Sequence, residues 1–205
     1  MAARAPRQGI LEIVSMDGSS FLRMLRLHGR SEEAGPVSSQ FEKELRGESP
    51  DFGVLALRAC GHTVGALSYG CLDLPFEPGT VSGRIDVVVT ERHCRGLGIG
   101  GILMASLFKK LIDEHGDRLR HFSTIAVHPA IVRFVSHFGF RRIEGGETPL
   151  YSITLNEATR QEFALQSERA LALAMNRLRQ RCLECRRRRW IVPWCTPVET
   201  DGSDK

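Results

Sequence analysis

Four glycines within six residues, at positions 96, 98, 100 and 101, constrain this chain more than any other feature. They lie in "ERHCRGLGIGG", between the β-branched run "IDVVV" and the apolar stretch "ILMASLFKKLI". Glycine contributes nothing to a core, so such a cluster indicates that something closely approaches the backbone. A strand, a glycine turn and a helix start leave backbone N–H groups unpaired at the positive end of the helix dipole. We therefore predict a phosphate-bearing cofactor at this loop.

Two other phosphate-binding motifs fit the loop poorly. Gly96, Gly98 and Gly101 match the dinucleotide fingerprint in form, but "TERHCR" separates them from the strand. The next predicted strand, "FSTIAVHP", also ends without the acidic residue that a Rossmann unit places there. The Gly-Lys-Ser/Thr of a P-loop is absent. The pattern thus disfavours both alternatives.

Hydrophobic periodicity predicts a single domain that ends near Asn156. A glycine-containing turn, "RACGHT", predicts that the second and third strands form a hairpin. The order of elements indicates an α/β or α+β domain with a mixed sheet. The predicted strands are Gly9 to Met16, Phe52 to Cys60, His62 to Leu72, Arg84 to Val89, His121 to Ala126 and Tyr151 to Leu155. The predicted helices are Ser19 to Leu27, Ser38 to Arg46, Gly100 to His115 and Pro129 to His137.

The composition changes after this domain. We divide the chain into a domain at 1–156, a long amphipathic helix with an Arg-rich end at 157–189, and a partly disordered tail at 190–205. The helix carries an apolar seam that must cover either the preceding domain or a second copy of the chain. Its members are Leu171, Met175, Leu178, Cys182 and Cys185.

The composition is that of an ordinary globular protein, with 42% hydrophobic and 25% charged residues. The start of the chain lacks the apolar region of a secretory signal, and no apolar run is long enough to cross a membrane. The six cysteines form no dense framework, so we expect mostly reduced thiols in a cytoplasmic protein.

The glycine loop resembles the pyrophosphate-binding signature of the GNAT superfamily of acyl-CoA-dependent N-acyltransferases, which reads Gln/Arg-x-x-Gly-x-Gly/Ala after a strand. "IDVVVTERHCRGLGIGGIL" follows the family pattern almost position by position, and "VRFVSHFGFRRI" resembles its later segment, with Phe134 in register. The resemblance is firm for residues 84–155, extends back to about residue 8 and leaves out the tail. It implies a mixed, mostly antiparallel sheet with a splayed central strand flanked by helices, here with a long C-terminal helix added.

The resemblance also implies acetyl-CoA, or another acyl-CoA, as co-substrate, a primary amine as acceptor, and no metal. The exposed backbone of the predicted cofactor strand would pair with the pantetheine amides, and one N–H would stabilise the oxyanion. The loop would hold the pyrophosphate through its N–H groups. The implied cofactor-binding residues are Val87, Val88, Val89, Arg95, Gly96, Leu97, Gly98, Ile99, Gly100, Gly101 and Phe134.

Transfer to an amine needs a base, and a departing thiolate is helped by an acid. Asp86, on the cofactor strand, is either this base, acting through a water, or a structural carboxylate. Members of the family often place a tyrosine acid where this chain has Val135. The thiolate therefore leaves unaided, or a neighbour substitutes; His128 and His137 are the candidates that we select, with Ser136 and Tyr69 as others.

Two alternatives to an enzyme stay open. The missing tyrosine suits a CoA-responsive binding or regulatory module of the same fold. The run Arg186 to Arg189, followed by "WIVPW", suits either nucleic-acid binding or simple stabilisation of a helix C-terminus.

Cys182, Cys185 and Cys195 supply one ligand too few for an ordinary structural zinc site. The long helix could also form a homodimer.

Overall fold

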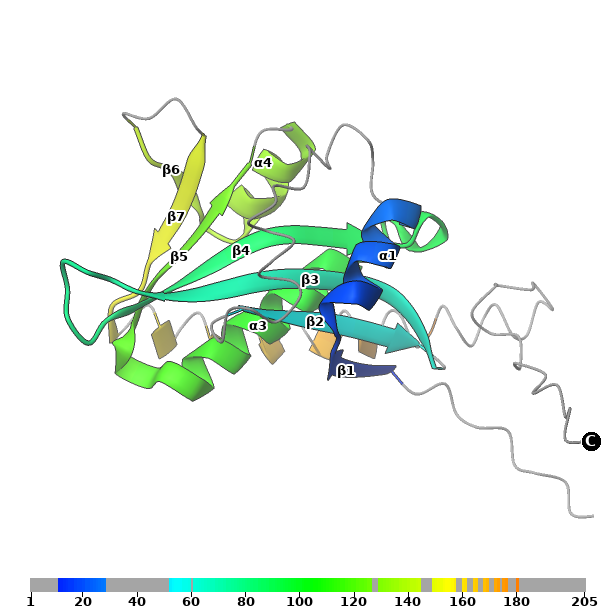
Figure 1. Ribbon diagram of the computed structural model, residues 1–205, viewed down its shortest axis with the longest axis horizontal. Helices are drawn as coiled ribbons and strands as arrows, with labels where there is room; N and C mark the ends of the chain where they lie inside the picture. The colour runs from blue at the N-terminus through cyan, green and yellow to red at the C-terminus, as the bar shows by residue number, and fades with distance from the viewer. Residues whose placement is uncertain are drawn as a thin grey trace, which may run out of the picture.

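The computed structural model describes a mixed α/β domain around one sheet (Figure 1). It describes residues 11–28, 52–59, 61–126, 129–144 and 149–157, with residues 160, 161, 164, 165, 168, 169, 172, 173, 175, 176 and 180. The strands are β1 Leu11–Ser15, β2 Phe52–Ala59, β3 His62–Asp73, β4 Val81–Thr90, β5 Leu119–Ile125, β6 Arg141–Arg142 and β7 Leu150–Thr154. The helices are α1 Gly18–His28, α3 Ile99–His115 and α4 Pro129–His137, with short 3₁₀ turns η2 Arg92–Cys94 and η3 Gly116–Arg118.

Within the described residues the sheet has seven strands, in the order β1-β2-β3-β4-β5-β7-β6. Neighbouring strands pair antiparallel except β4 and β5, which are parallel. A parallel pair needs a crossover, and α3 supplies it. This mixed, mostly antiparallel sheet confirms the predicted fold class.

The predicted strands, and the predicted helices that fall on described residues, agree with the structure except in their bounds. The predicted hairpin is confirmed, because β2 and β3 pair antiparallel. The strand predicted at Arg84 to Val89 is longer than expected, because β4 begins at Val81. The two-residue strand β6 was not predicted, since two residues carry no periodicity. The predicted helix Ser38 to Arg46 lies outside the described residues.

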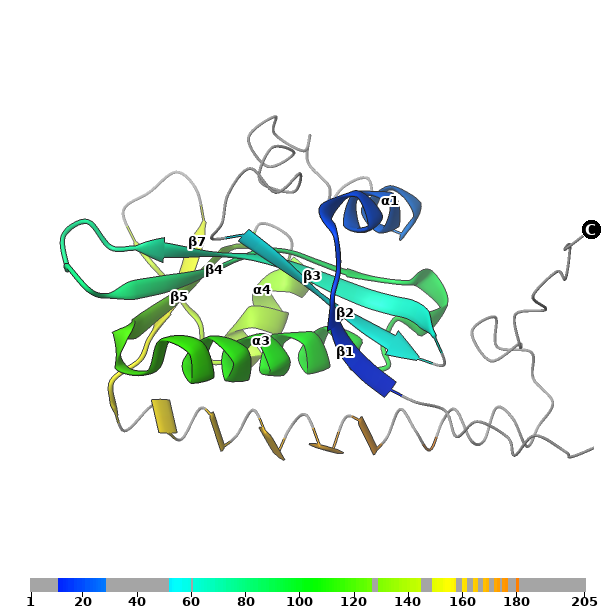
Figure 2. The same ribbon diagram turned by 60° about the horizontal axis from the view of Figure 1, so that its bottom comes forward.

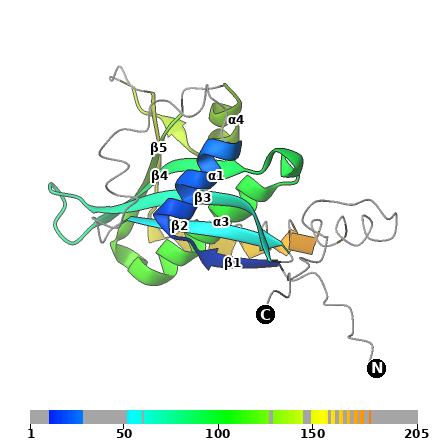
Figure 3. The same cartoon turned by 45° about the vertical axis from the view of Figure 1, so that its right-hand side comes forward.

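Helices cover both faces of the sheet (Figure 2). On one face, α1 lies across β2, β3 and β4 (Figure 3), where Phe21 and Met24 pack with the β4 residue Val89. On the other face, α3 and α4 enclose the larger core. Apolar residues at helical spacing along α3 fill this core, among them Ile102, Leu107 and Leu111.

The described residues of the C-terminal extension are helical and run along the outer side of α3 (Figure 2). Met175 packs against the larger core, and Glu168 lies 3.3 Å from the Lys109 ammonium of α3. Arg160 is buried and donates hydrogen bonds to Asp117 and to the Leu119 carbonyl. Here, then, the helix packs against its own domain. The other seam residues lie outside the described part of the chain.

No helix among the described residues is both long and apolar enough to cross a membrane.

Candidate cofactor and acyl-transfer site

The two parallel strands β4 and β5 separate at the centre of the sheet. Their pairing ends at Ile85 and Thr124, whereas β4 continues to Thr90 (Figure 1). The last four residues of β4, Val87 to Thr90, therefore have a strand partner on the β3 side alone. This is the splayed central strand that the resemblance implied.

A β-bulge in β4 lies where the two strands separate. Ser68 and Tyr69 are consecutive in β3 but pair with Val87 and Ile85, so Asp86 is the extra residue. Such a bulge reverses the alternation of side chains along a strand. Accordingly, Ile85 belongs to the core on the α3 face, whereas Val87 packs with α1 on the opposite face.

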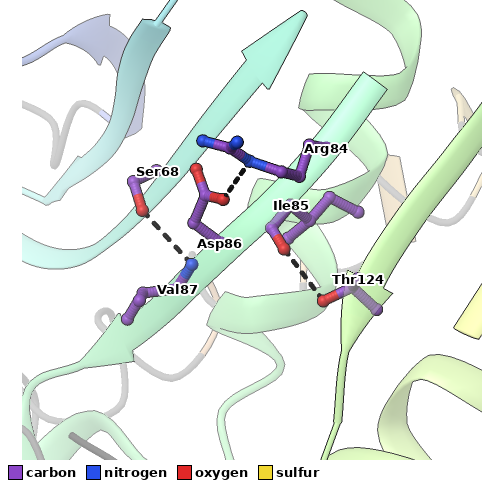
Figure 4. A network of polar contacts seen from close by, with 6 residues as sticks. All are labelled: Ser68, Arg84, Ile85, Asp86, Val87 and Thr124. Atoms are coloured by element: carbon purple, nitrogen blue, oxygen red, sulfur yellow. Dashed lines mark hydrogen bonds and ion pairs between the residues drawn. The ribbon is translucent and has the colours of Figure 1, made fainter. Parts of the chain in front are cut away.

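Two hydroxyl groups satisfy the backbone at this bulge (Figure 4). The Val87 N–H donates to the Ser68 hydroxyl at 3.2 Å, and the Thr124 hydroxyl donates to the Ile85 carbonyl at 2.9 Å. Ser68 and Thr124 are both buried. Because an unsatisfied buried backbone group is expensive, these hydroxyls stabilise the irregular strand.

An ion pair fixes the bulge residue Asp86. The Arg84 Nε lies 2.5 Å from the Asp86 Oδ1, and only 12% of the Asp86 side chain is exposed. The guanidinium lies over Gly70, where a Cβ would be in ordinary van der Waals contact with Nη2 of Arg84 at 3.4 Å. Asp86 is thus a held, largely buried carboxylate at the splay.

The main chain of Val88 points into the space between the strands. The Glu91 N–H donates to the Val64 carbonyl at 3.0 Å, which marks a hydrogen-bonded pair of the β3–β4 ladder. Such pairs alternate along antiparallel strands, so Val87 and Val89 also direct their main-chain groups to β3. Val88 therefore directs its N–H and C=O to the other side, where β5 has ended.

Glycine is required at two positions of the loop after β4. Gly96 and Gly98 have φ angles of 76° and 80°, in the left-handed region that other residues rarely adopt. A Cβ at either position would meet no atom of the described residues within 4 Å. The surface above both residues is therefore open.

The loop after β4 uses the N–H groups of Cys94, Arg95 and Leu97 internally, and the Cys94 N–H bonds the Glu91 carbonyl at 2.9 Å. The Arg95 N–H bonds the Arg92 carbonyl at 3.5 Å, and the Leu97 N–H bonds the Cys94 carbonyl at 3.3 Å. These turns bring the chain from the end of β4 to the start of α3. The N–H groups that follow them lie at the start of this helix.

Those N–H groups belong to the first turn of α3. Gly98 is the N-cap and gives no side-chain cap, and no acidic residue lies in the first turn. The Ile102 N–H makes the first return bond, 3.0 Å to the Gly98 carbonyl. An α-helix leaves the earlier donors without intrahelical acceptors. They are the N–H groups of Ile99, Gly100 and Gly101.

Phe134 of α4 packs against this first turn. A Cβ at Gly100 would lie 3.3 Å from the Phe134 ring and 3.7 Å from a Val88 methyl. Gly100 therefore permits close packing of α3 between α4 and β4. Phe138 stacks edge-on to Phe134, with ring centroids 5.3 Å apart. A Cβ at Gly101 would lie 3.9 Å from the Phe138 ring.

The Arg95 side chain leaves the loop altogether. Its Nη2 donates a 2.6 Å hydrogen bond to the carbonyl of His28, the last residue of α1. The sequence pattern treated Arg95 as part of the cofactor loop and gave no signal of this contact, which joins residues 67 positions apart.

Of the two histidine candidates, His137 alone lies within the described residues. His137 is the last residue of α4 and is exposed, and its ring lies edge-on to Phe138. His128 lies outside the described residues. Val135, at the position of the family's tyrosine, is 3% exposed and belongs to the core.

Tyr69 lies on the α3 face of the sheet, away from the loop. Its ring crosses Gly53, where a Cβ would lie 2.5 Å from the hydroxyl. Burial raises the pKa of Tyr69, and the Lys110 ammonium opposes that rise. Lys110 stands eleven residues after Ile99, so it is about 16 Å along α3 from the loop.

Three polar residues of this site were not predicted from the sequence: Ser68, Arg84 and Thr124. Each had a signal. Ser68 interrupts the apolar run "VGALSYGC", and Arg84 precedes Asp86 by two positions, which puts both on one face of a strand. Thr124 gives only a weak signal, because threonine is common in strands.

The described residues contain no group of three or more His, Cys, Asp or Glu that could hold a metal ion. Cys182, Cys185 and Cys195 lie outside them.

No protein-family model matches the sequence, and no curated protein matches it. Solved structures do match. A protein assigned to the GNAT family of acetyltransferases from Desulfovibrio desulfuricans is 14% identical with a TM-score of 0.55, over 71% of this chain and 99% of that one. AtaTR bound with AcCoA is 13% identical with a TM-score of 0.56, over 76% and 97%. NAA60 from Arabidopsis thaliana in complex with acetyl-CoA is 13% identical with a TM-score of 0.54, over 72% and 99%.

At these identities the similarity concerns the fold. The mixed sheet, the separation of β4 from β5 and the glycine loop before α3 agree with it. This chain has the GNAT fold.

Proposed function

We propose that this protein is an N-acyltransferase that transfers an acetyl or other acyl group from acyl-CoA to a primary amine by direct attack in a ternary complex. One observation carries the proposal. The open first turn of α3, which has no side-chain cap, follows the strand whose pairing to β5 has ended, after the loop at residues 91–98. A diphosphate and an extended amide chain would be bound by adjacent parts of the backbone.

The described residues fit both parts of an acyl-CoA. The N–H groups of Ile99, Gly100 and Gly101 provide donors for the pyrophosphate, and the helix dipole favours its charge. Open space above Gly98 admits the phosphate oxygens. The N–H and C=O of Val88 can pair with a pantetheine amide as an added strand would. Phe134 supplies an apolar wall beside this path.

In the reaction, the amine nitrogen attacks the thioester carbonyl carbon and forms the new C–N bond. The C–S bond then breaks, and its electron pair leaves with the sulfur of CoA. A backbone N–H of β4 stabilises the oxygen anion that forms between these steps. The amine must lose one proton in the process.

Asp86 is our candidate to accept that proton, through a water. The bulge places it at the splay, and 12% of its side chain is exposed. Arg84 fixes its orientation through a 2.5 Å contact. A structural role, with Asp86 serving only this ion pair, is the competing interpretation.

A CoA-responsive binding module of the same fold is the second candidate. It is favoured by Val135, which is buried at the position of the family's tyrosine and offers no proton. In an enzyme, the thiolate would then leave without a residue at this position, as a good leaving group.

Two measurements separate these functions. Calorimetry with coenzyme A and acetyl-CoA tests the cofactor site, and thiol release from acetyl-CoA with a panel of amines, followed by mass spectrometry of the products, tests transfer. Binding with transfer supports the enzyme, and binding without transfer to any amine supports the module. Absence of binding to either ligand contradicts both.

A further inference from the structure

The Arg95 guanidinium connects the cofactor loop to a helix that is distant in sequence. Its 2.6 Å bond to the His28 carbonyl is charge-assisted, and such bonds are roughly twice as strong as neutral ones. The last carbonyls of a helix lack intrahelical donors, and a cation at this end is also favoured by the dipole. Arg95 thus acts as a C-terminal cap of α1.

A second, independent attachment joins α1 to the cofactor strand. Phe21, Met24 and Leu25 of α1 form an apolar cluster with Val89, and Val87 packs against it. Hence α1 is held by β4 through its apolar face and by the loop after β4 through its last carbonyl. The position of the loop and the position of α1 cannot change independently while both attachments persist.

The loop does not need this guanidinium to bind an anion, because the first turn of α3 supplies unpaired N–H donors. We propose that Arg95 is a positioning residue, whose side chain couples occupancy of the cofactor loop to the placement of α1 over the face of the sheet opposite α3. The coupling rests on the proposed acyl-CoA function, whereas the contact itself does not.

Thermodynamic linkage predicts that binding of a ligand at the loop stabilises the attachment of α1, and this effect can be measured. An anion that orders the loop fixes the Arg95 main chain, and this strengthens its hold on α1. Coenzyme A should therefore slow amide exchange in α1, although α1 contributes none of the N–H donors assigned to the phosphate.

The experiment is hydrogen exchange by mass spectrometry on the full chain, with and without coenzyme A. Arg95→Met keeps the apolar stem and removes the guanidinium, and Arg95→Lys restores a donor. Arg92→Met, in the same loop with an exposed side chain, is the matched control. His28→Ala is a second control, because the bond uses the main-chain carbonyl and not the ring.

Without ligand, we expect Arg95→Met to speed exchange in the last turn of α1 by roughly tenfold, with partial rescue in Arg95→Lys and no change in either control. With coenzyme A, we expect protection of α1 in the wild type and in Arg92→Met, and none in Arg95→Met. Calorimetry should give coenzyme A affinities within about threefold of wild type for Arg95→Met, since the N–H donors remain.

Three results would overturn the proposal. Unchanged α1 exchange in Arg95→Met would show that the contact does not hold the helix. Equal protection by coenzyme A in Arg95→Met and wild type would remove the coupling. A large loss of coenzyme A affinity with unchanged α1 exchange would make Arg95 a phosphate ligand instead. If the wild type fails to bind coenzyme A, the proposed function fails, and the exchange data without ligand still decide whether Arg95 holds α1.

Discussion

The Thr124 hydroxyl donates a 2.9 Å hydrogen bond to the Ile85 carbonyl at the last point where β4 and β5 pair. The bond is buried and directly precedes the bulge at Asp86, so the contact helps to set where the two strands separate. A single hydroxyl therefore helps to define the mouth of the proposed pantetheine channel.

Replacing this hydroxyl should weaken the domain. Thr124→Val leaves the Ile85 carbonyl buried without its donor, and we expect the free energy of unfolding in urea to fall by about 1–3 kcal/mol. Thr124→Ser retains the donor and is the matched control, with a smaller loss from one methyl group. If Thr124→Val and Thr124→Ser destabilise the protein equally, the loss of stability comes from packing rather than from the hydrogen bond.

Gly98→Glu should abolish binding of coenzyme A while the domain remains folded. The new carboxylate would project into the open space above the loop and repel the pyrophosphate, so we expect calorimetry to show at least a hundredfold loss of affinity. The strained φ angle adds a stability loss of about 1 kcal/mol. Gly61→Glu is the matched control for Gly98→Glu. Gly61 lies in the β2–β3 turn, has a φ of 88° and has equally open surroundings among the described residues.

The Gly61 variant should lose similar stability and keep its full affinity for coenzyme A. Equal affinity in the two variants would mean that the loop does not carry the pyrophosphate site.

Asp86→Asn should lower turnover without weakening cofactor binding. A general base contributes about 10²–10⁴ to a rate, and we expect a fall in kcat within that range for any amine that reacts. The KM for acetyl-CoA should stay within about threefold, because Asp86 is not among the proposed cofactor ligands. Asp113→Asn, at an exposed carboxylate of α3, is the control. Undiminished turnover in Asp86→Asn would leave the ion pair to Arg84 as its whole role.

Tyr69 should make stability sensitive to alkaline pH. Its pKa in the folded protein is raised by burial above the ordinary 10.0, so the folded state holds the phenol proton more tightly than the unfolded chain. This contribution is present below about pH 10 and is lost as the pH rises through the folded pKa. Urea titrations at pH 8 and at about pH 11 should show a smaller decline for Tyr69→Phe than for wild type; parallel declines would contradict this.

The sequence predicted the parts of the site that depend on local backbone chemistry. The glycines at 96 and 98 adopt the left-handed conformation that only such residues tolerate well, and α3 begins directly after them. The β2–β3 hairpin was signalled by its glycine turn, and Gly61 there has a positive φ. In these cases the residue type alone restricts the conformation.

The parts that were not predicted depend on neighbours in space. "RIDVVV" looks like an ordinary strand, and nothing in it marks Asp86 as a bulge, because the bulge arises from the register with Ser68 and Tyr69. The bond from Arg95 to His28 requires the tertiary placement of α1. A long polar side chain in a loop has too many potential acceptors for sequence to select one.

The helix that starts at the glycine loop is enclosed on two sides, by the sheet and by the described residues of the C-terminal extension (Figure 2). Its amide donors are consequently pre-organised, and a ligand that reaches them forfeits little conformational entropy of the protein. The C-terminal extension is far in sequence from the proposed diphosphate site. It would nevertheless raise the affinity for the ligand, because it makes α3 more rigid.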